Sequence, residues 1–295
     1  MFKNKLQIRY KQLLTFTEYE NKNYFTTNKI NAYKNNLINN EKYKGDISKT
    51  SKKNISRAVD LLLQSTKTKR IYNPVTDKYF YFKINFITLT IPDHNLLMNV
   101  NDIYKLCLKP ILRQLKEKHP NFKYIVKLEF QDNGMPHYHI TSNTFINHDI
   151  IRNLWNKKLQ YYGMLDKFKS DYNHYNPNST DVHAVYKIKN LKAYLIKYIS
   201  KPHTNKNNLK GTEDSNGNKL KFKVWYCSDE LKGVKYFSLD SNKFNELMIN
   251  EAKRLKLIKV KYLDNCSLIE SKYSSILNLI DDKQLTEYKQ FLNNI

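Results

Sequence analysis

The chain is organised around one stretch, Gly134-Met135-Pro136-His137-Tyr138-His139-Ile140. Side chains alternate between the two faces of a strand, so His137 and His139 point to the same face. The preceding run, residues 124–131, has the apolar and β-branched residues of a second strand, and a turn at residues 132–134 separates the two. The sequence therefore predicts an antiparallel hairpin that presents two imidazoles side by side. A metal site built on this pair needs at least one more ligand.

The neighbouring strand offers two candidates for that ligand, Glu129 and Gln131. A two-residue turn would pair Phe130 with His137 and send Glu129 to the opposite face. A three-residue turn, with Gly134 in the left-handed conformation and a bulge, would pair Glu129 with His137 instead. We predict the three-residue turn, because it assembles a site. Imidazole and carboxylate ligands without a thiolate favour Mg²⁺ or Mn²⁺.

A second stretch of interest reads Tyr194-Leu195-Ile196-Lys197-Tyr198-Ile199-Ser200-Lys201. On a helix, the two tyrosines and the two lysines lie on one stripe. In a chain with 23 tyrosines, this spacing also fits an ordinary amphipathic helix. A free phenol has a pKa of about 10, so a nucleophilic tyrosine needs a nearby cation to favour the phenolate. Lys197 and Lys201 are placed to supply one, and Tyr194 and Tyr198 are the predicted nucleophiles. Of the remaining, scattered histidines, His183 is noteworthy because it precedes this helix.

The patterning along the chain predicts an α+β fold with a mainly antiparallel sheet and helices on one face. Residues 1–77 are expected to form a loosely ordered basic arm followed by a short helix near Ser56 and a hairpin with a turn at residues 73–77. Residues 78–240 are expected to form the main domain, and residues 241–295 a basic tail of two amphipathic helices. Within the main domain we expect strands at residues 79–91, 124–131, 136–144, 182–188 and 221–226, and helices at residues 96–118 (kinked near Pro110), 147–160 and 191–201.

The composition favours a polyanionic partner. The formal net charge is +24, from 51 Lys and Arg against 27 Asp and Glu, although an AT-rich genome would also raise the lysine content. The three cysteines form no C-x-x-C pair, which argues against a disulfide framework or a thiolate zinc site and favours a reducing cytoplasm. We expect no membrane segment and no signal peptide.

With both motifs placed, the chain resembles the HUH endonucleases, in particular two-tyrosine rolling-circle replication initiator (Rep) proteins of single-stranded DNA phages and plasmids. The histidine motif and the two-tyrosine motif carry this resemblance, together with Phe86-Ile87-Thr88-Leu89-Thr90 and with the segment around Trp225. The resemblance implies a five-stranded antiparallel sheet with flanking helices and a metal-dependent nick in single-stranded origin DNA through a 5′-phosphotyrosine. We expect DNA contacts from Lys127, Thr88, Thr90 and Trp225.

The implied partners are single-stranded origin DNA and a host helicase and DNA polymerase, in the cytoplasm of a bacterial host. The sequence contains no G-x-x-x-x-G-K-[ST] motif, so we expect no nucleotide cofactor. A two-tyrosine transposase or a relaxase would use the same chemistry. The non-enzymatic alternative is a basic protein that binds single-stranded nucleic acid through exposed aromatic residues.

Overall fold

The computed structural model describes residues 2–19, 47–74, 76–92, 97–185, 191–200, 209–240, 246–263, 266–271 and 276–295. The chain forms two compact units: residues 45–232, here called the central unit, and residues 1–44 with 233–295, here called the terminal unit. The boundaries fall at 44/45 and 232/233, whereas the sequence suggested 77/78 and 240/241.

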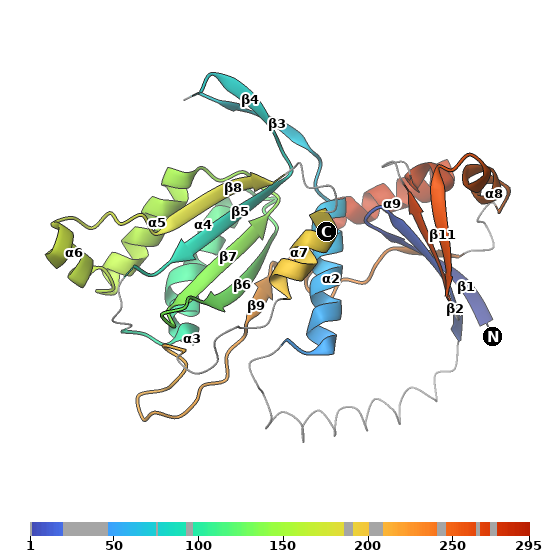
Figure 1. Cartoon of the computed structure of the whole chain (residues 1–295). Coiled ribbons are helices and arrows are strands. Elements are labelled where there is room, and N and C mark those ends of the chain that lie inside the picture. The colour runs from blue at the N-terminus through green and yellow to red at the C-terminus, as the bar shows by residue number, and fades with distance from the viewer. Residues whose placement is uncertain are drawn as a thin grey trace. The chain divides into compact units, whose positions relative to one another are not determined.

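The central unit is built on a five-stranded antiparallel sheet with the strand order β8-β5-β7-β6-β9. This confirms the predicted α+β class, and the strands of the sheet lie side by side in the left part of Figure 1. Its strands are β5 (Ile84–Thr90), β6 (Tyr124–Phe130), β7 (Pro136–Ser142), β8 (Thr180–Val185) and β9 (Trp225–Cys227).

One face of this sheet carries the main hydrophobic core. Alternate residues such as Ile87, Leu89 and Tyr138 are fully buried there, and Trp155 packs against them and donates a 2.8 Å hydrogen bond to the carbonyl of Thr90. The helices on this face are α3 (Val100–Asp102), the π-helical segment η2 (Ile103–Leu108), α4 (Lys109–Lys118) and α5 (His148–Tyr161).

The π-helical segment lies where the sequence predicted a kink. Pro110 has no N–H to give to the carbonyl four residues earlier, and the N–H of Lys109 bonds the carbonyl of Tyr104 instead. The predicted long helix is therefore interrupted by a π-helical turn between α3 and α4. The unit also contains α6 (Asp166–Tyr172) and the short η3 (Asp229–Leu231).

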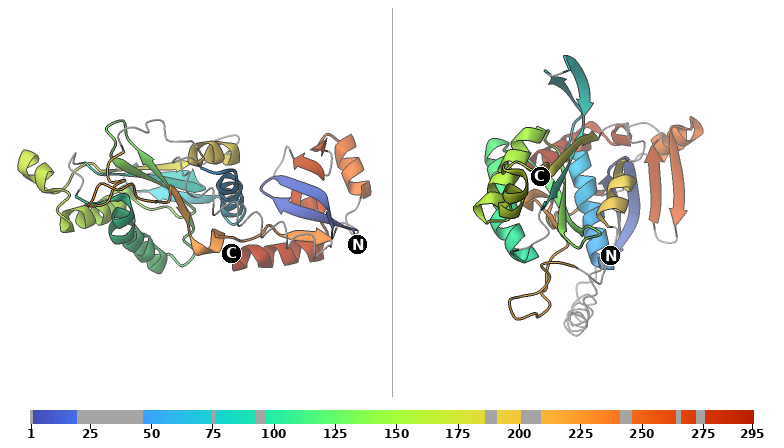
Figure 2. Two further views of the ribbon diagram at one scale, coloured as in Figure 1. Left: turned by 90° about the horizontal axis from the view of Figure 1, so that it is seen from below. Right: turned by 60° about the vertical axis from the view of Figure 1, so that its left-hand side comes forward.

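The opposite face of the sheet is covered at one side by α2 (Lys49–Gln64) and α7 (Leu191–Ile199), which pack along each other (Figure 2). The prediction of helices on one face only was wrong, because α7 needs cover for its buried Leu195 and Ile199 and finds it on this side. Helix α2 begins after Ser48, whose side chain caps it, earlier than the start near Ser56 that the sequence suggested.

Strands β3 (Lys69–Asn73) and β4 (Lys78–Phe82) form a separate two-stranded hairpin around the predicted turn. Lys83 interrupts the run at residues 79–91, which is two strands rather than the single one expected. The hairpin projects beyond the end of the sheet and leads through Lys83 directly into β5 (Figures 1 and 2).

The terminal unit joins the two ends of the sequence in a second five-stranded sheet, with the order β10-β1-β2-β12-β11. It contains the helices α8 (Glu246–Arg254) and α9 (Asp282–Asn294) and the short η5 (Ile276–Leu279). Its strands are β1 (Phe2–Arg9), β2 (Gln12–Tyr19), β10 (Ser238–Asp240), β11 (Ile258–Leu263) and β12 (Cys266–Ser271).

Strands therefore replace part of the expected arm and of the expected helical tail. The residues Ile258-Lys259-Val260-Lys261 alternate in burial with the period of a strand, and β2 pairs with β12 across almost the whole sequence. No helix in the described part of the chain has the length and apolar character that a bilayer crossing requires.

Candidate functional site

The hairpin of β6 and β7 has the three-residue turn that the site requires. Glu129 lies directly opposite His137, and Phe130 opposite Pro136. Gly134 has a φ of 80°, in the left-handed region where glycine meets no steric penalty. Its N–H bonds the carbonyl of Gln131. The predicted register is confirmed, and the carboxylate and both imidazoles share one face of the sheet.

Two cross-strand rows gather the predicted site residues on this face. The first row runs Trp225, Lys127, His139, Thr88 across four strands. The second row runs Glu129, His137, Thr90 across three strands. All seven residues that the sequence assigned to metal or DNA binding therefore lie next to one another. Strand parity and the hairpin register align Lys127, Glu129, His137 and His139, and the pairing of β5 with β7 and of β9 with β6 adds the other three.

The histidine rings are held by hydroxyl groups from β5. The Thr88 hydroxyl lies 3.1 Å from Nδ1 of His139, and the Thr90 hydroxyl lies 3.3 Å from Nε2 of His137. Nε2 of His139 lies 3.2 Å from a carboxylate oxygen of Glu129. A hydroxyl can donate or accept, so Thr88 supports either tautomer of His139, including the one that leaves Nε2 available to a metal.

The metal-binding prediction fits this arrangement in part. Two ligands at right angles on an ion, each about 2.1 Å away, are separated by about 3 Å, close to the distance between Glu129 and His139. Within the described residues, however, no group of three His, Cys, Asp or Glu side chains is arranged to hold a metal ion. Nε2 of His137 lies against the Thr90 hydroxyl, whereas Nε2 of His139 lies against Glu129.

Helix α7 places one of its two tyrosines against the histidines. The Tyr198 ring packs edge-on against His139, with centroids 5.1 Å apart, and against Phe86 at 4.8 Å. The Tyr194 ring is nearly parallel to that of Tyr198, with centroids 6.3 Å apart, and is 41% exposed. Tyr198 therefore contacts His139, and Tyr194 lies next to Tyr198 on its solvent-exposed side. Lys197 is exposed, and Lys201 lies outside the described residues.

Burial and nearby charges set the protonation of these groups. Burial raises the pKa of Tyr198, and electrostatic interactions with Glu129 and Tyr194 raise it further. Burial lowers the pKa of His137 to about 4, with His139 acting in the same direction and Glu129 opposing both. Burial likewise lowers the pKa of Lys127 to about 8, against the opposing effect of Glu129. The neutral imidazole of His137 suits a metal ligand, whereas the phenol of Tyr198 needs added positive charge to ionise.

Sequence reasoning missed two features that position the tyrosine helix. Lys192 forms a 2.8 Å ion pair with Asp60 of α2, a carboxylate that is almost completely buried. Phe86 supports both Tyr198 and His139. Phe86 alternates with Thr88 and Thr90 along one strand, so its position on the site face could have been predicted. Nothing in the local sequence connects Asp60 to Lys192. His183 lies on the same sheet face, exposed, and pairs with Asp181 at 2.6 Å.

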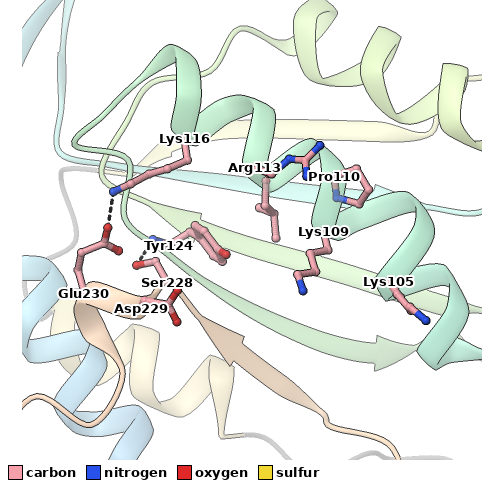
Figure 3. Close-up of a pocket in the computed structure, with 10 residues that line it drawn as sticks. Lys105, Lys109, Pro110, Arg113, Lys116, Tyr124, Ser228, Asp229 and Glu230 are labelled. Atoms are coloured by element: carbon pink, nitrogen blue, oxygen red, sulfur yellow. Dashed lines mark hydrogen bonds and ion pairs between the residues drawn. The ribbon is translucent and has the colours of Figure 1, made fainter.

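A pocket of about 420 Å³ lies elsewhere in the central unit, between α4, the start of β6 and η3. Figure 3 shows its mixed lining, with Lys105, Lys109 and Arg113 from the helical side and Glu230, which is paired with Lys116. Tyr124, at the start of β6, belongs to the face of the sheet that carries the main hydrophobic core. None of the residues that line this pocket is among the predicted site residues.

Residues 84–203 match the model of a protein family described as replication-associated protein ORF2. The match includes strands β5 to β8 and helix α7, so both histidines, Glu129 and both tyrosines fall inside it. The hairpin β3–β4, strand β9 and the terminal unit fall outside. Comparison with curated proteins gave no match, and comparison with solved structures gave none. The family similarity supports a replication-associated protein that resembles replication initiators.

Proposed function

We propose that this protein initiates rolling-circle replication by nicking and rejoining single-stranded origin DNA, with Tyr198 as the first nucleophile. The observation that supports this proposal is the contact of the Tyr198 ring with His139, in the segment that matches the replication-associated family. Tyr194, stacked outward of Tyr198, would serve the second strand transfer.

In the first transfer, the phenol oxygen of Tyr198 would form a bond to phosphorus while the bond from phosphorus to the 3′ oxygen breaks. The departing 3′ oxygen would take up, through water, the proton that the phenol releases. The 5′-phosphate would then remain on the tyrosine, and the 3′-hydroxyl would be free to prime synthesis. The ester conserves the bond energy for a later rejoining step.

The residues that would hold Mg²⁺ or Mn²⁺ are Glu129, His139 and His137. Such an ion would withdraw charge from the phosphate oxygens and would lower the pKa of the neighbouring phenol. Thr88 and Thr90 would fix the two imidazole rings. Lys127, in the same cross-strand row as His139, would place a positive charge beside the scissile phosphate.

The test is a covalent adduct assay with fragments that tile the single strand of the DNA molecule encoding this protein, in the presence of Mn²⁺. Adduct formation should be lost in Tyr198→Phe and retained in Tyr172→Phe, a control at an exposed tyrosine of α6. A persistent adduct in the Tyr194→Phe/Tyr198→Phe double variant would remove both tyrosines from the mechanism. If the wild-type protein bound the fragments without forming any adduct, the proposed enzymatic function would be wrong and a non-enzymatic binding protein would be favoured.

A further inference from the structure

The hairpin β3–β4 has two unlike faces, and cross-strand pairing decides which residues share each of them. One face turns to the body of the unit: Phe82 is completely buried, and Phe80 and Phe82 pack edge-on against Phe145, with ring centroids 5.5 and 5.7 Å apart. Ile71 lies opposite Phe80 and is partly buried with it. This contact anchors the hairpin, so its orientation on the sheet is fixed by packing.

The other face carries three tyrosines and an arginine. Tyr72 lies opposite Tyr79, and Arg70 lies opposite Tyr81. We call these four residues the tyrosine face. The three tyrosines are 47%, 58% and 54% exposed in sequence order. The Arg70 guanidinium sits 4.2 Å above the Tyr79 ring, and the Tyr72 and Tyr79 centroids are 5.2 Å apart. An exposed aromatic group of this size on a projecting ribbon marks an interaction surface.

The charges around the tyrosine face indicate the partner. Residues 66–83 contain the basic residues Lys67, Lys69, Arg70, Lys78 and Lys83 and one acidic residue, Asp77. That carboxylate accepts a 2.7 Å hydrogen bond from the Tyr72 hydroxyl. Planar rings combined with a guanidinium plane and flanking lysines suit bases that stack and phosphates that need neutralising. The hairpin therefore has the composition of a single-strand binding platform.

We propose that the tyrosine face binds single-stranded DNA by base stacking, as a contact site separate from the histidine–tyrosine site. Lys83 alone separates the hairpin from β5, the strand that carries Thr88 and Thr90, so a strand held on the tyrosine face is tethered to the sheet. The hairpin precedes the segment that matches the replication-associated family, which makes this platform a feature of this chain outside the shared segment. The binding does not depend on the nicking chemistry.

The test is fluorescence anisotropy of the full-length protein with a labelled 20-nucleotide mixed-sequence single strand and with the matching duplex. The variant Tyr72→Ser/Tyr79→Ser/Tyr81→Ser should bind the single strand about 30-fold more weakly or worse. The variant with phenylalanine at the same three positions should bind nearly as the wild type, because stacking needs the ring and not the hydroxyl. A matched control, Tyr161→Ser/Tyr172→Ser, removes exposed tyrosines outside the hairpin and should change binding less than twofold.

Charge and stacking can be separated with salt. The variant Arg70→Gln should reduce the dependence of binding on salt concentration, because fewer phosphate contacts release fewer counterions, whereas the serine variant should leave that dependence unchanged. Unaltered single-strand binding by the serine variant would overturn the proposal. So would an equal loss on the duplex, which would indicate groove binding, or a change in self-association without a change in DNA binding, which would indicate a contact between copies. In the Tyr198→Phe background, where no adduct is expected, the serine substitutions on the tyrosine face should weaken single-strand binding by the same factor as in the wild type, and this separates the platform from the proposed nicking activity.

Discussion

The two five-stranded sheets of this protein, one in each unit, have the same antiparallel pairing, but they place their polar residues differently. In the terminal unit, Lys261 and Glu270 pair at 3.0 Å, with side chains 60% and 30% exposed. In the central unit, Lys127 is 1% exposed and His139 8% exposed. Polar groups on a solvent-exposed sheet face cost little folding free energy. Buried polar groups oppose folding unless all their hydrogen bonds and charges have partners. Replacing the buried cation of this row therefore tests whether the row contributes to stability or serves the proposed chemistry.

The largest expected effect comes from the buried ion pair that fixes the tyrosine helix. Lys192→Met would leave the Asp60 carboxylate without this cation and should destabilise the packing of α7 by about 3–5 kcal/mol. Hydrogen exchange of the α7 amides measures this loss directly. The double variant Asp60→Leu/Lys192→Met should recover most of the protection, because it removes both charges. A loss below about 1 kcal/mol in Lys192→Met would place this pair with the exposed pairs of the terminal unit.

The second effect should have the opposite sign. Lys127→Met removes a cation whose pKa burial has lowered, so the unfolding free energy should rise by about 1–2 kcal/mol while single-strand binding weakens. Urea denaturation and anisotropy measure the two effects on the same sample. Lys157→Met, at an exposed position of α5, should change stability by less than about 0.5 kcal/mol. Destabilisation by Lys127→Met would mean that the buried cation is a structural partner and not a site residue.

A smaller effect depends on pH. Burial alone would raise the pKa of Glu230, but the hydrogen bond and charge of Lys116 outweigh it, and the pKa is lowered. A lowered carboxyl pKa contributes stability that is present above the unfolded value of about 4.3 and is lost as the pH falls through the folded value. Glu230→Gln should therefore cost about 1 kcal/mol at pH 7 and less at pH 3, measured by urea denaturation at both pH values. Glu117→Gln, at a 67% exposed side chain, should cost less at pH 7.

The smallest effect is expected on the exposed face of the terminal sheet. Lys261→Ala should cost about 0.2–1 kcal/mol, and this cost should shrink further at high salt because the pair with Glu270 is solvated. Thermal unfolding at low and high ionic strength measures both values. A loss larger than about 2 kcal/mol would erase the contrast between the two sheets.

Local chemistry was enough to predict the centre of the site. The turn at residues 132–134 determines the register of β6 and β7, and period-2 alternation then aligns Glu129, His137 and His139. Helical periodicity located α7 and its two tyrosines. These signals lie within a few residues of the features they predict, which is why they could be read without a structure. The metal, the DNA contacts and the covalent chemistry remain predictions.

Distance along the chain explains what the sequence did not reveal. Strands β1 and β2 lie in a lysine- and asparagine-rich region and pair with each other as a hairpin. The strands that complete their sheet, β10 and β12, lie near the other end of the chain, so no local pattern predicts that pairing. The same holds for Asp60 and Lys192, which belong to different helices. Propensity can suggest that a segment is extended, but it cannot name the strand that completes its sheet.

The pairing of β2 with β12 also imposes an order on biosynthesis. Gln12 and Glu270, which share a 2.9 Å hydrogen bond, are 258 positions apart. Domains generally fold as units during synthesis, so residues 45–232 can fold on the ribosome as one continuous piece. At that stage the hairpin of β1 and β2 still lacks β12, the strand that pairs with β2. Closing so long a loop is slow compared with local folding. A translation product that stops early would then carry the histidines and tyrosines on a folded central sheet. Its first strands, β1 and β2, would have no partner from β10 or β12. Quality-control proteases could recognise these exposed strand edges and remove the truncated product.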